Sequence, residues 1–142
     1  MTKFDWEEQI GFVAAELEEA GYTVIESTDA EDRAELEDRV VYINSRCHPE
    51  TRFYTLLHEF GHVDIYEHSA HDFEADHPMY YRIDSVRTAR SKAARVSIVA
   101  EEIEAWKRGR WLAREYELYI NDEKYDHHMT NALMSYVNWA AD

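Results

Sequence analysis

The sequence predicts a mostly helical α+β domain whose small β-sheet packs on a central helix. Three observations support this fold class. Apolar residues recur at helical spacing over most of the chain, and two short runs of β-prone residues lie within its first third. With 142 residues, 45% of them hydrophobic, the chain is long enough and apolar enough for one core. We therefore expect a single domain over residues 1–142.

The first predicted helix covers residues 4–20. Asp5 is placed to cap this helix and Gly21 to end it. The apolar positions repeat at spacings of four, three and four, which puts them on one helical face: Trp6, Ile10, Val13 and Leu17.

Two strands are expected next, at residues 22–25 and 39–43, because both runs are rich in β-branched and aromatic residues. The segment between them, residues 26–38, is strongly acidic and has few apolar residues. We expect this segment to form a loop or a short exposed turn of helix.

Three further helices are expected in the rest of the chain. The first runs over residues 49–67, with a proline in its first turn, and a loop at 68–84 follows it. A long helix covers residues 85–119. A last helix over residues 127–140 presents Leu133, Val137 and Trp139.

The composition limits the partners and the compartment of the protein. Thirty acidic residues and fifteen basic ones give a formal net charge of −15, which argues against direct binding to a nucleic-acid backbone. The single cysteine, Cys47, cannot form an intrachain disulfide and is expected to be a packed thiol. No run resembles a signal segment or reaches membrane-spanning length, so we expect a cytoplasmic protein with no membrane partner.

The functional prediction rests on the motif His58-Glu59-Phe60-Gly61-His62. Two histidines four residues apart lie on one face of a helix and can hold one zinc ion together. The glutamate between them lies beside the metal, where it can accept a proton from a water molecule that zinc has acidified. The pattern predicts a zinc-dependent hydrolase, with Glu59 as the general base.

A pair of surface histidines on an amphipathic helix is the alternative interpretation, because the chain holds eight histidines and many glutamates. The rest of the helix favours the metal site. Its apolar side chains form one stripe opposite the two histidines, so the stripe can pack into the core while the histidines face a cleft. The stripe consists of Phe53, Leu56, Leu57, Phe60 and Val63.

Zinc held by two histidines needs a third protein ligand, and His68 is one candidate. It lies six residues after His62, which is the ligand spacing of metzincins. Those proteins need a glycine midway so that the chain can turn back to the metal, and this chain has Ile65 there. We therefore expect an exposed histidine at position 68.

Glu102 is the other candidate, and helical phase favours it. A helical projection of the long helix predicts a buried stripe made up of Val96, Val99, Ile103 and Trp106. Glu102 then lies near the edge of the stripe, within reach of a cleft, whereas Glu101 and Glu104 fall on the solvated side.

Two segments of the chain resemble the ImmA/IrrE-type zinc metallopeptidases. The strand Val41-Tyr42-Ile43-Asn44 and the helix with the two histidines are similar to the strand and active helix of that family. Glu102-Ile103-Glu104-Ala105 is similar to its later E-x-E-A segment, whose first glutamate is the third zinc ligand. The family has asparagine directly after this segment, where this chain has Trp106.

The resemblance covers about residues 1–115 and implies a minimal catalytic core of the gluzincin type, with a zincin-like fold. It implies bound Zn²⁺ held by His58, His62 and Glu102. It also implies hydrolysis of a peptide bond in a protein substrate, which in this family is often a transcriptional repressor.

Two functional questions stay open at this stage. The sequence does not choose the residue that stabilises the oxyanion, for which the candidates are Tyr80, Tyr81, His71, His77, Tyr125 and His127. Asn44 and an edge of the small sheet are expected to position an extended substrate. The alternative function is a non-catalytic metal-binding or acidic interaction protein that binds a basic partner.

Overall fold

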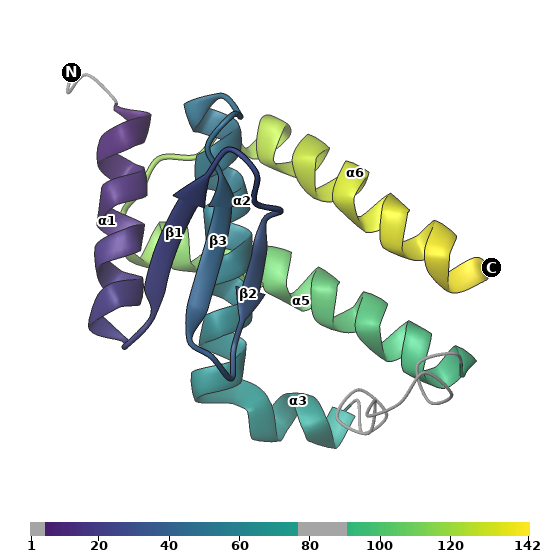
Figure 1. Ribbon diagram of the computed structural model, residues 1–142. Coiled ribbons are helices and arrows are strands. Elements are labelled where there is room, and N and C mark those ends of the chain that lie inside the picture. The colour runs from purple at the N-terminus through teal and green to yellow at the C-terminus, as the bar shows by residue number, and fades with distance from the viewer. Residues whose placement is uncertain (1–4, 77–90) are drawn as a thin grey trace.

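The computed structural model describes residues 5–76 and 91–142 of the chain. Within these ranges the fold is mostly helical α+β, with a small sheet packed on a central helix, so the predicted fold class is confirmed (Figure 1). The elements are α1 (Trp6–Glu19), β1 (Thr23–Ser27), β2 (Arg33–Glu35), β3 (Val40–Asn44), α2 (Pro49–Asp64), the π-helical turn η1 (Ile65–Ser69), α3 (Ala70–Asp76), α5 (Lys92–Glu115) and α6 (Asp122–Ala141).

α1 forms as its sequence predicts. The Asp5 carboxylate accepts hydrogen bonds from the backbone N–H groups of Glu7 and Glu8, which satisfies two donors that the first helical turn leaves unpaired. Gly21 follows the helix with a φ of 94°, a conformation that suits glycine. The apolar face of α1 is buried against α2 through Ile10, Val13 and Leu17.

The sheet has the order β1-β3-β2, with β1 parallel and β2 antiparallel to the central strand β3. β3 turns Val41 and Ile43 into the core. The prediction that residues 26–38 hold no strand is wrong, because β2 lies within them. This strand depends on pairing, with Arg33 opposite Tyr42, rather than on an apolar pattern of its own.

α2 is the central helix of the fold, and all five residues of its predicted apolar stripe are buried. The chain then remains helical through η1 and α3, so the loop predicted at 68–84 is wrong as far as Asp76. A π-helical turn absorbs an extra residue without ending the helix, which explains why no break occurs there. The rest of that loop, and the first residues of the predicted helix at 85–119, lie outside the described residues.

α5 crosses α2 with almost no space between the two backbones. A Cβ atom placed on Gly61 would meet the Ala105 carbonyl oxygen at 2.0 Å, and one placed on Gly109 would meet the Leu57 carbonyl oxygen at 2.5 Å. Only glycine at both positions permits this crossing. The face of α5 that packs on α2 must therefore carry small or specifically paired side chains.

The stripe predicted to be buried on α5 is largely wrong. Val96 is 63% exposed and Ile103 is 37% exposed, whereas Trp106 is buried as expected. The helix is rotated relative to the predicted phase, because close packing on α2 selects small residues instead of large apolar ones. The buried residues of α5 are Ala94, Ser97, Glu101, Glu102, Ala105, Trp106, Gly109, Leu112 and Ala113.

α6 begins at Asp122, earlier than predicted, with the Asn121 side chain capping its first turn. Tyr125 is fully buried, whereas Val137 and Trp139 are exposed. Cys47 is also exposed and is not the packed thiol that we predicted. Among the described residues, no helix combines the length and the apolar character needed to cross a bilayer.

Candidate metal centre

α2 and α5 bring three potential metal ligands to one point. The Nε2 atom of His58 lies 2.8 Å from Oε2 of Glu102 and 3.0 Å from Nε2 of His62. Nε2 of His62 lies 3.3 Å from the same glutamate oxygen. A tetrahedral zinc ion with bonds of about 2.0–2.1 Å separates its ligand atoms by roughly 3.3 Å. The three side chains therefore have nearly the spacing that zinc requires.

The charges at this point also suit a cation. Burial would raise the pKa of Glu102, but hydrogen bonds from His58 and His62 outweigh it and hold that pKa well below the usual range. Burial lowers the pKa of His58, which favours the neutral imidazole that binds metals. The set offers one anionic oxygen and two ring nitrogens, a combination typical of zinc ligands.

Glu59 is the most unusual group in the centre. It is only 3% exposed, and its Oε2 atom has no hydrogen-bond partner among the described residues. Burial raises its pKa to about 8. A buried carboxylate oxygen without a partner is costly, and a water molecule held between this oxygen and a metal ion would supply one.

Glu101 was predicted to be solvated, and this prediction is wrong. It is 4% exposed, and its Oε1 atom lies 2.6 Å from Nδ1 of His62. The rotation of α5 turns both Glu101 and Glu102 towards α2. Burial would lower the pKa of His62, but hydrogen bonds to Glu101 and Glu102 outweigh it and raise that pKa. A metal ion would take the place of the proton on Nε2, while Nδ1–H continues to donate to Glu101.

His68 lies outside this cluster. Its side chain is 72% exposed, and its nearest acidic partner is Asp64 at 4.0 Å. The helical path through η1 carries His68 past the centre instead of back to it. Glu104 is partly exposed and pairs with Lys107 at 3.6 Å. Of the two candidates for the third ligand, only Glu102 lies with His58 and His62.

Trp106 supports the ring of His58. The two rings stack with centroids 4.4 Å apart and planes 7° apart. Tyr125 packs edge-on against Trp106 at 5.4 Å, and its hydroxyl donates a hydrogen bond to the Trp106 carbonyl. Trp106 therefore places a flat aromatic ring behind a potential metal ligand.

None of the described residues that were candidates for stabilising the oxyanion reaches the centre with a free hydrogen-bond donor. The Tyr125 hydroxyl is committed to the Trp106 carbonyl, and both His71 and His127 are exposed. The other three candidates, Tyr80, Tyr81 and His77, lie outside the described residues.

Tyr136 on α6 is a candidate site residue that the sequence analysis did not identify. Burial and the neighbouring Glu102 raise its pKa, and its hydroxyl forms a hydrogen bond with the Glu102 carboxylate. The charges of Glu59 and Glu101 act on it as well. A sequence signal existed in retrospect, because Tyr136 continues the inward face of α6 that Tyr125 begins, at helical spacing.

Asn44, which was expected to position a substrate, uses its polar groups within the protein. Its Nδ2 donates to the Ala30 carbonyl at 3.0 Å, and its Oδ1 accepts from the Arg46 N–H at 2.8 Å. Its own backbone N–H donates to Asp32 at 2.7 Å. Asn44 therefore fixes the loop before β2 rather than a substrate.

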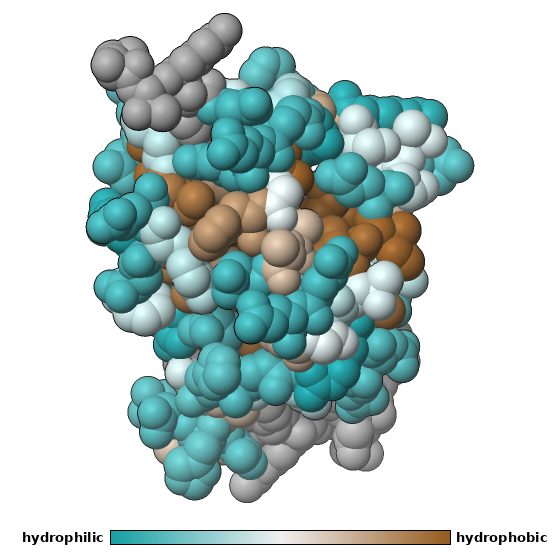
Figure 2. Space-filling model, turned by 90° about the vertical axis from the view of Figure 1, so that its left-hand side faces the viewer, coloured by the Kyte–Doolittle hydropathy of each residue, from teal (hydrophilic) through white to brown (hydrophobic). Residues whose placement is uncertain are grey.

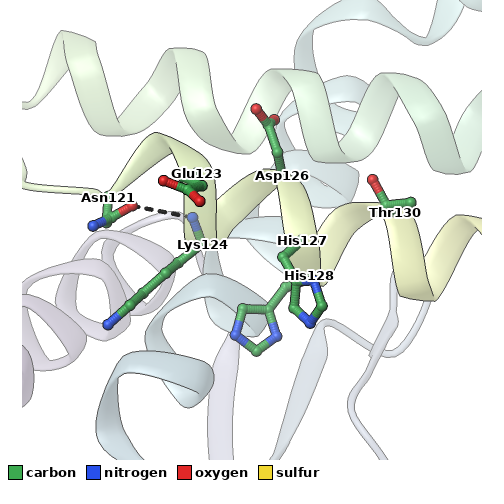
Figure 3. Close-up of a pocket in the computed structure, with 7 residues that line it drawn as sticks. All are labelled: Asn121, Glu123, Lys124, Asp126, His127, His128 and Thr130. Carbon is green, nitrogen blue, oxygen red and sulfur yellow. Dashed lines mark hydrogen bonds between the residues drawn. The ribbon is translucent and has the colours of Figure 1, made fainter.

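A separate hollow of about 540 Å³ lies at the N-terminal end of α6 (Figure 3). Asp126 points away from His127 and His128 in this view and pairs with Arg110 at 2.7 Å, so these side chains do not converge. Among the described residues, both groups of side chains that could hold a metal ion include His62. The candidate site is therefore the cluster between α2 and α5.

Comparison with known proteins adds no relative. No family, no curated protein and no solved structure matches this chain. The side chains of α2, α5 and α6 therefore carry the functional interpretation.

Proposed function

We propose that the protein is a zinc-dependent metallopeptidase of the ImmA/IrrE type that hydrolyses a peptide bond in a protein substrate. His58, His62 and Glu102 would hold the ion. One observation carries the proposal: three ligand atoms lie 2.8–3.3 Å apart, directly beside a buried carboxylate oxygen that has no partner. If the two histidines had only a structural role, nothing would explain why the Oε2 atom of Glu59 is buried beside them without a hydrogen-bond partner in the described part of the chain.

Zinc, when bound, would polarise the scissile carbonyl and acidify the attacking water. Glu59 takes the proton from that water and passes it to the leaving amine. Burial raises the pKa of Glu59 to about 8, and the positive charge of a bound zinc ion would lower that pKa and favour the carboxylate form that accepts the proton. Glu101 keeps the His62 ring in one orientation throughout.

Tyr136 is the donor that we assign to the oxyanion. Its hydroxyl lies beside Glu102 and, like any tyrosine hydroxyl, keeps its proton at neutral pH. Once zinc binds the Glu102 carboxylate, this hydroxyl would be able to turn from Glu102 to the oxyanion. A hydrogen bond from this group to the developing negative charge stabilises the transition state more than the ground state.

A non-catalytic acidic protein that binds a basic partner is the second candidate, and the net charge of −15 favours it. Such a protein would bind its partner with a strong salt dependence and without zinc. We also propose that the protein acts in the cytoplasm, because its single cysteine requires no oxidising compartment.

The decisive experiment combines metal analysis with one substitution. Purified protein should carry about one zinc ion per chain, and Glu59→Gln should keep that zinc while cleavage of a proteome-derived peptide library falls by about 100-fold or more. Glu104→Gln is the matched control, because it removes a partly exposed carboxylate from α5 that lies outside the cluster. Failure to take up zinc, or undiminished cleavage by Glu59→Gln, would refute the proposal.

A further inference from the structure

A second hollow, of about 400 Å³, lies between the first half of α5 and the second half of α6. The described residues that line it are Ile98 from α5, and Ser135, Tyr136 and Trp139 from α6. These two helix segments run beside each other to one side of the sheet and α2 (Figure 1). Two large apolar side chains and a tyrosine ring make most of this wall apolar.

The hollow adjoins the metal centre through two of its residues. Tyr136 lines the hollow and also forms a hydrogen bond with Glu102. Ile98 precedes Glu102 by four residues, which is about one helical turn, so both side chains lie on the same side of α5. A group bound beside Glu102 and Tyr136 is thus one turn from the hollow.

We propose that this hollow holds a large apolar side chain of the substrate, next to the scissile bond. The inference rests on the proposed peptidase function and specifies its substrate class. Wall residues such as Ile98 and Trp139 offer no charge and little hydrogen bonding to water, so covering them with an apolar side chain is favourable. A volume of about 400 Å³ accommodates an aromatic or large aliphatic side chain.

A positive charge lies at the edge of the hollow and is expected to affect which substrate side chains can enter it. The Arg95 guanidinium lies 5.4 Å from the centre of the Trp139 ring, and its Nη1 donates to the Trp139 carbonyl at 3.4 Å. A lysine or arginine side chain entering the hollow would meet a like charge there. The site should therefore reject basic side chains at this position, although the protein as a whole is acidic.

Apolar surface elsewhere does not carry the same inference. A band of apolar side chains is visible across α1 and towards the sheet (Figure 2), and Phe12 and Ile25 are exposed in this region. None of the described catalytic candidates borders that band. The hollow at Tyr136 differs because one of its walls is itself part of the proposed site.

Binding of three hydroxamates to the zinc-loaded protein tests the inference without requiring turnover. The probes are acetohydroxamate, a hydroxamate with a benzyl group one carbon from the chelating group, and the same scaffold with an aminobutyl group. Isothermal titration should show the benzyl probe binding at least about tenfold more tightly than acetohydroxamate, because its ring is buried. The aminobutyl probe should gain no such advantage.

Ser135→Phe and Asn138→Phe form the matched pair of variants. Both add one phenyl ring to α6, but only Ser135 lines the hollow, whereas Asn138 is an exposed residue outside it. Filling the hollow with Ser135→Phe should reduce the benzyl preference to within about threefold, and Asn138→Phe should preserve it.

The outcomes separate the two proposals. Equal binding of all probes by the zinc-loaded wild type, or a preference that survives in Ser135→Phe, would overturn the hollow as a specificity site while leaving the peptidase assignment intact. Absence of bound zinc, with no hydroxamate bound at all, would overturn the proposed function and this inference together.

Discussion

α2 and α5 cross at the candidate metal centre, yet their apolar patterns describe their buried faces with very different accuracy. On α2 the large apolar residues mark the core face, and all five predicted positions are buried. On α5 the large residues Val96 and Ile103 face outward, and small or acidic residues face inward. Hydrophobic periodicity therefore identifies a helix face only where that face packs against a roomy core.

The difference follows from what each helix packs against. α2 lies against the sheet and α1, where bulky side chains fill the space between layers. α5 lies directly against α2 at Gly61 of α2 and Gly109 of α5, where no bulky side chain fits. The carboxylates of Glu101 and Glu102 are tolerated on this face because each has a histidine partner.

The largest expected effect tests the core face of α2. Leu56 is almost fully buried in the main apolar cluster, so Leu56→Ala should reduce the free energy of unfolding by about 2–5 kcal/mol. Urea denaturation in the presence of a chelator measures this change without a contribution from metal binding. A loss below about 1 kcal/mol would mean that the α2 stripe is not the core that its burial indicates.

The next effect tests the helix crossing. In Gly61→Ala the new Cβ would overlap the backbone of Ala105, so we expect a loss of about 3 kcal/mol. Gly11→Ala is the control, because nothing lies within 4 Å of the added atom, and it should stabilise α1 by roughly 0.5–1 kcal/mol. Equal responses of the two variants would contradict the close contact between α2 and α5.

The third prediction concerns the acidic face of α5. Removal of the partner of His62 Nδ1 in Glu101→Ala should weaken zinc binding by about 10–100-fold. Glu104→Ala is the control on the same helix. It should change zinc affinity by less than about threefold, because the Glu104 side chain is partly exposed and pairs with Lys107. Zinc titration against a competing chelator measures both affinities. Equal zinc affinities of the two variants would contradict the contact between Glu101 and His62.

The smallest effect tests the outward face of α5. Because Ile103 is partly exposed, Ile103→Ser should change the free energy of unfolding by no more than about 0.5 kcal/mol. The predicted phase of the helix would instead require a loss of several kcal/mol, as for a core residue. Urea denaturation measures the free energy of unfolding of Ile103→Ser and Leu56→Ala under the same conditions, so the two helix faces can be compared directly.

Local patterns were sufficient where helix geometry alone fixes the arrangement. The four-residue spacing of His58 and His62 determines that their rings can meet, whatever surrounds the helix. Likewise, Asp5 and Gly21 mark the ends of α1 through backbone chemistry within a few residues. These features need no knowledge of the tertiary structure.

Features that depend on distant contacts were not predictable in the same way. The helical phase that favours Glu102 as a ligand is incorrect, because Val96 and Ile103 are exposed. The same incorrect phase predicts that Glu101 is solvated, whereas Glu101 is buried. β2 forms through its register with β3, and Tyr136 reaches Glu102 only because α6 folds back along α5. Each of these arrangements is set by a partner far away in the sequence, which a periodic pattern does not report.

The stack of Trp106 on His58 has an optical consequence. Indole emission is quenched by a protonated imidazole in contact with it. The emission changes again when the imidazole binds a metal ion instead of a proton. With the two rings nearly parallel at 4.4 Å, the fluorescence of Trp106 depends on the chemical state of His58. The protein therefore contains its own fluorophore at the centre, and the part of its emission that comes from Trp106, one of four tryptophans, reports the state of that histidine without any added label.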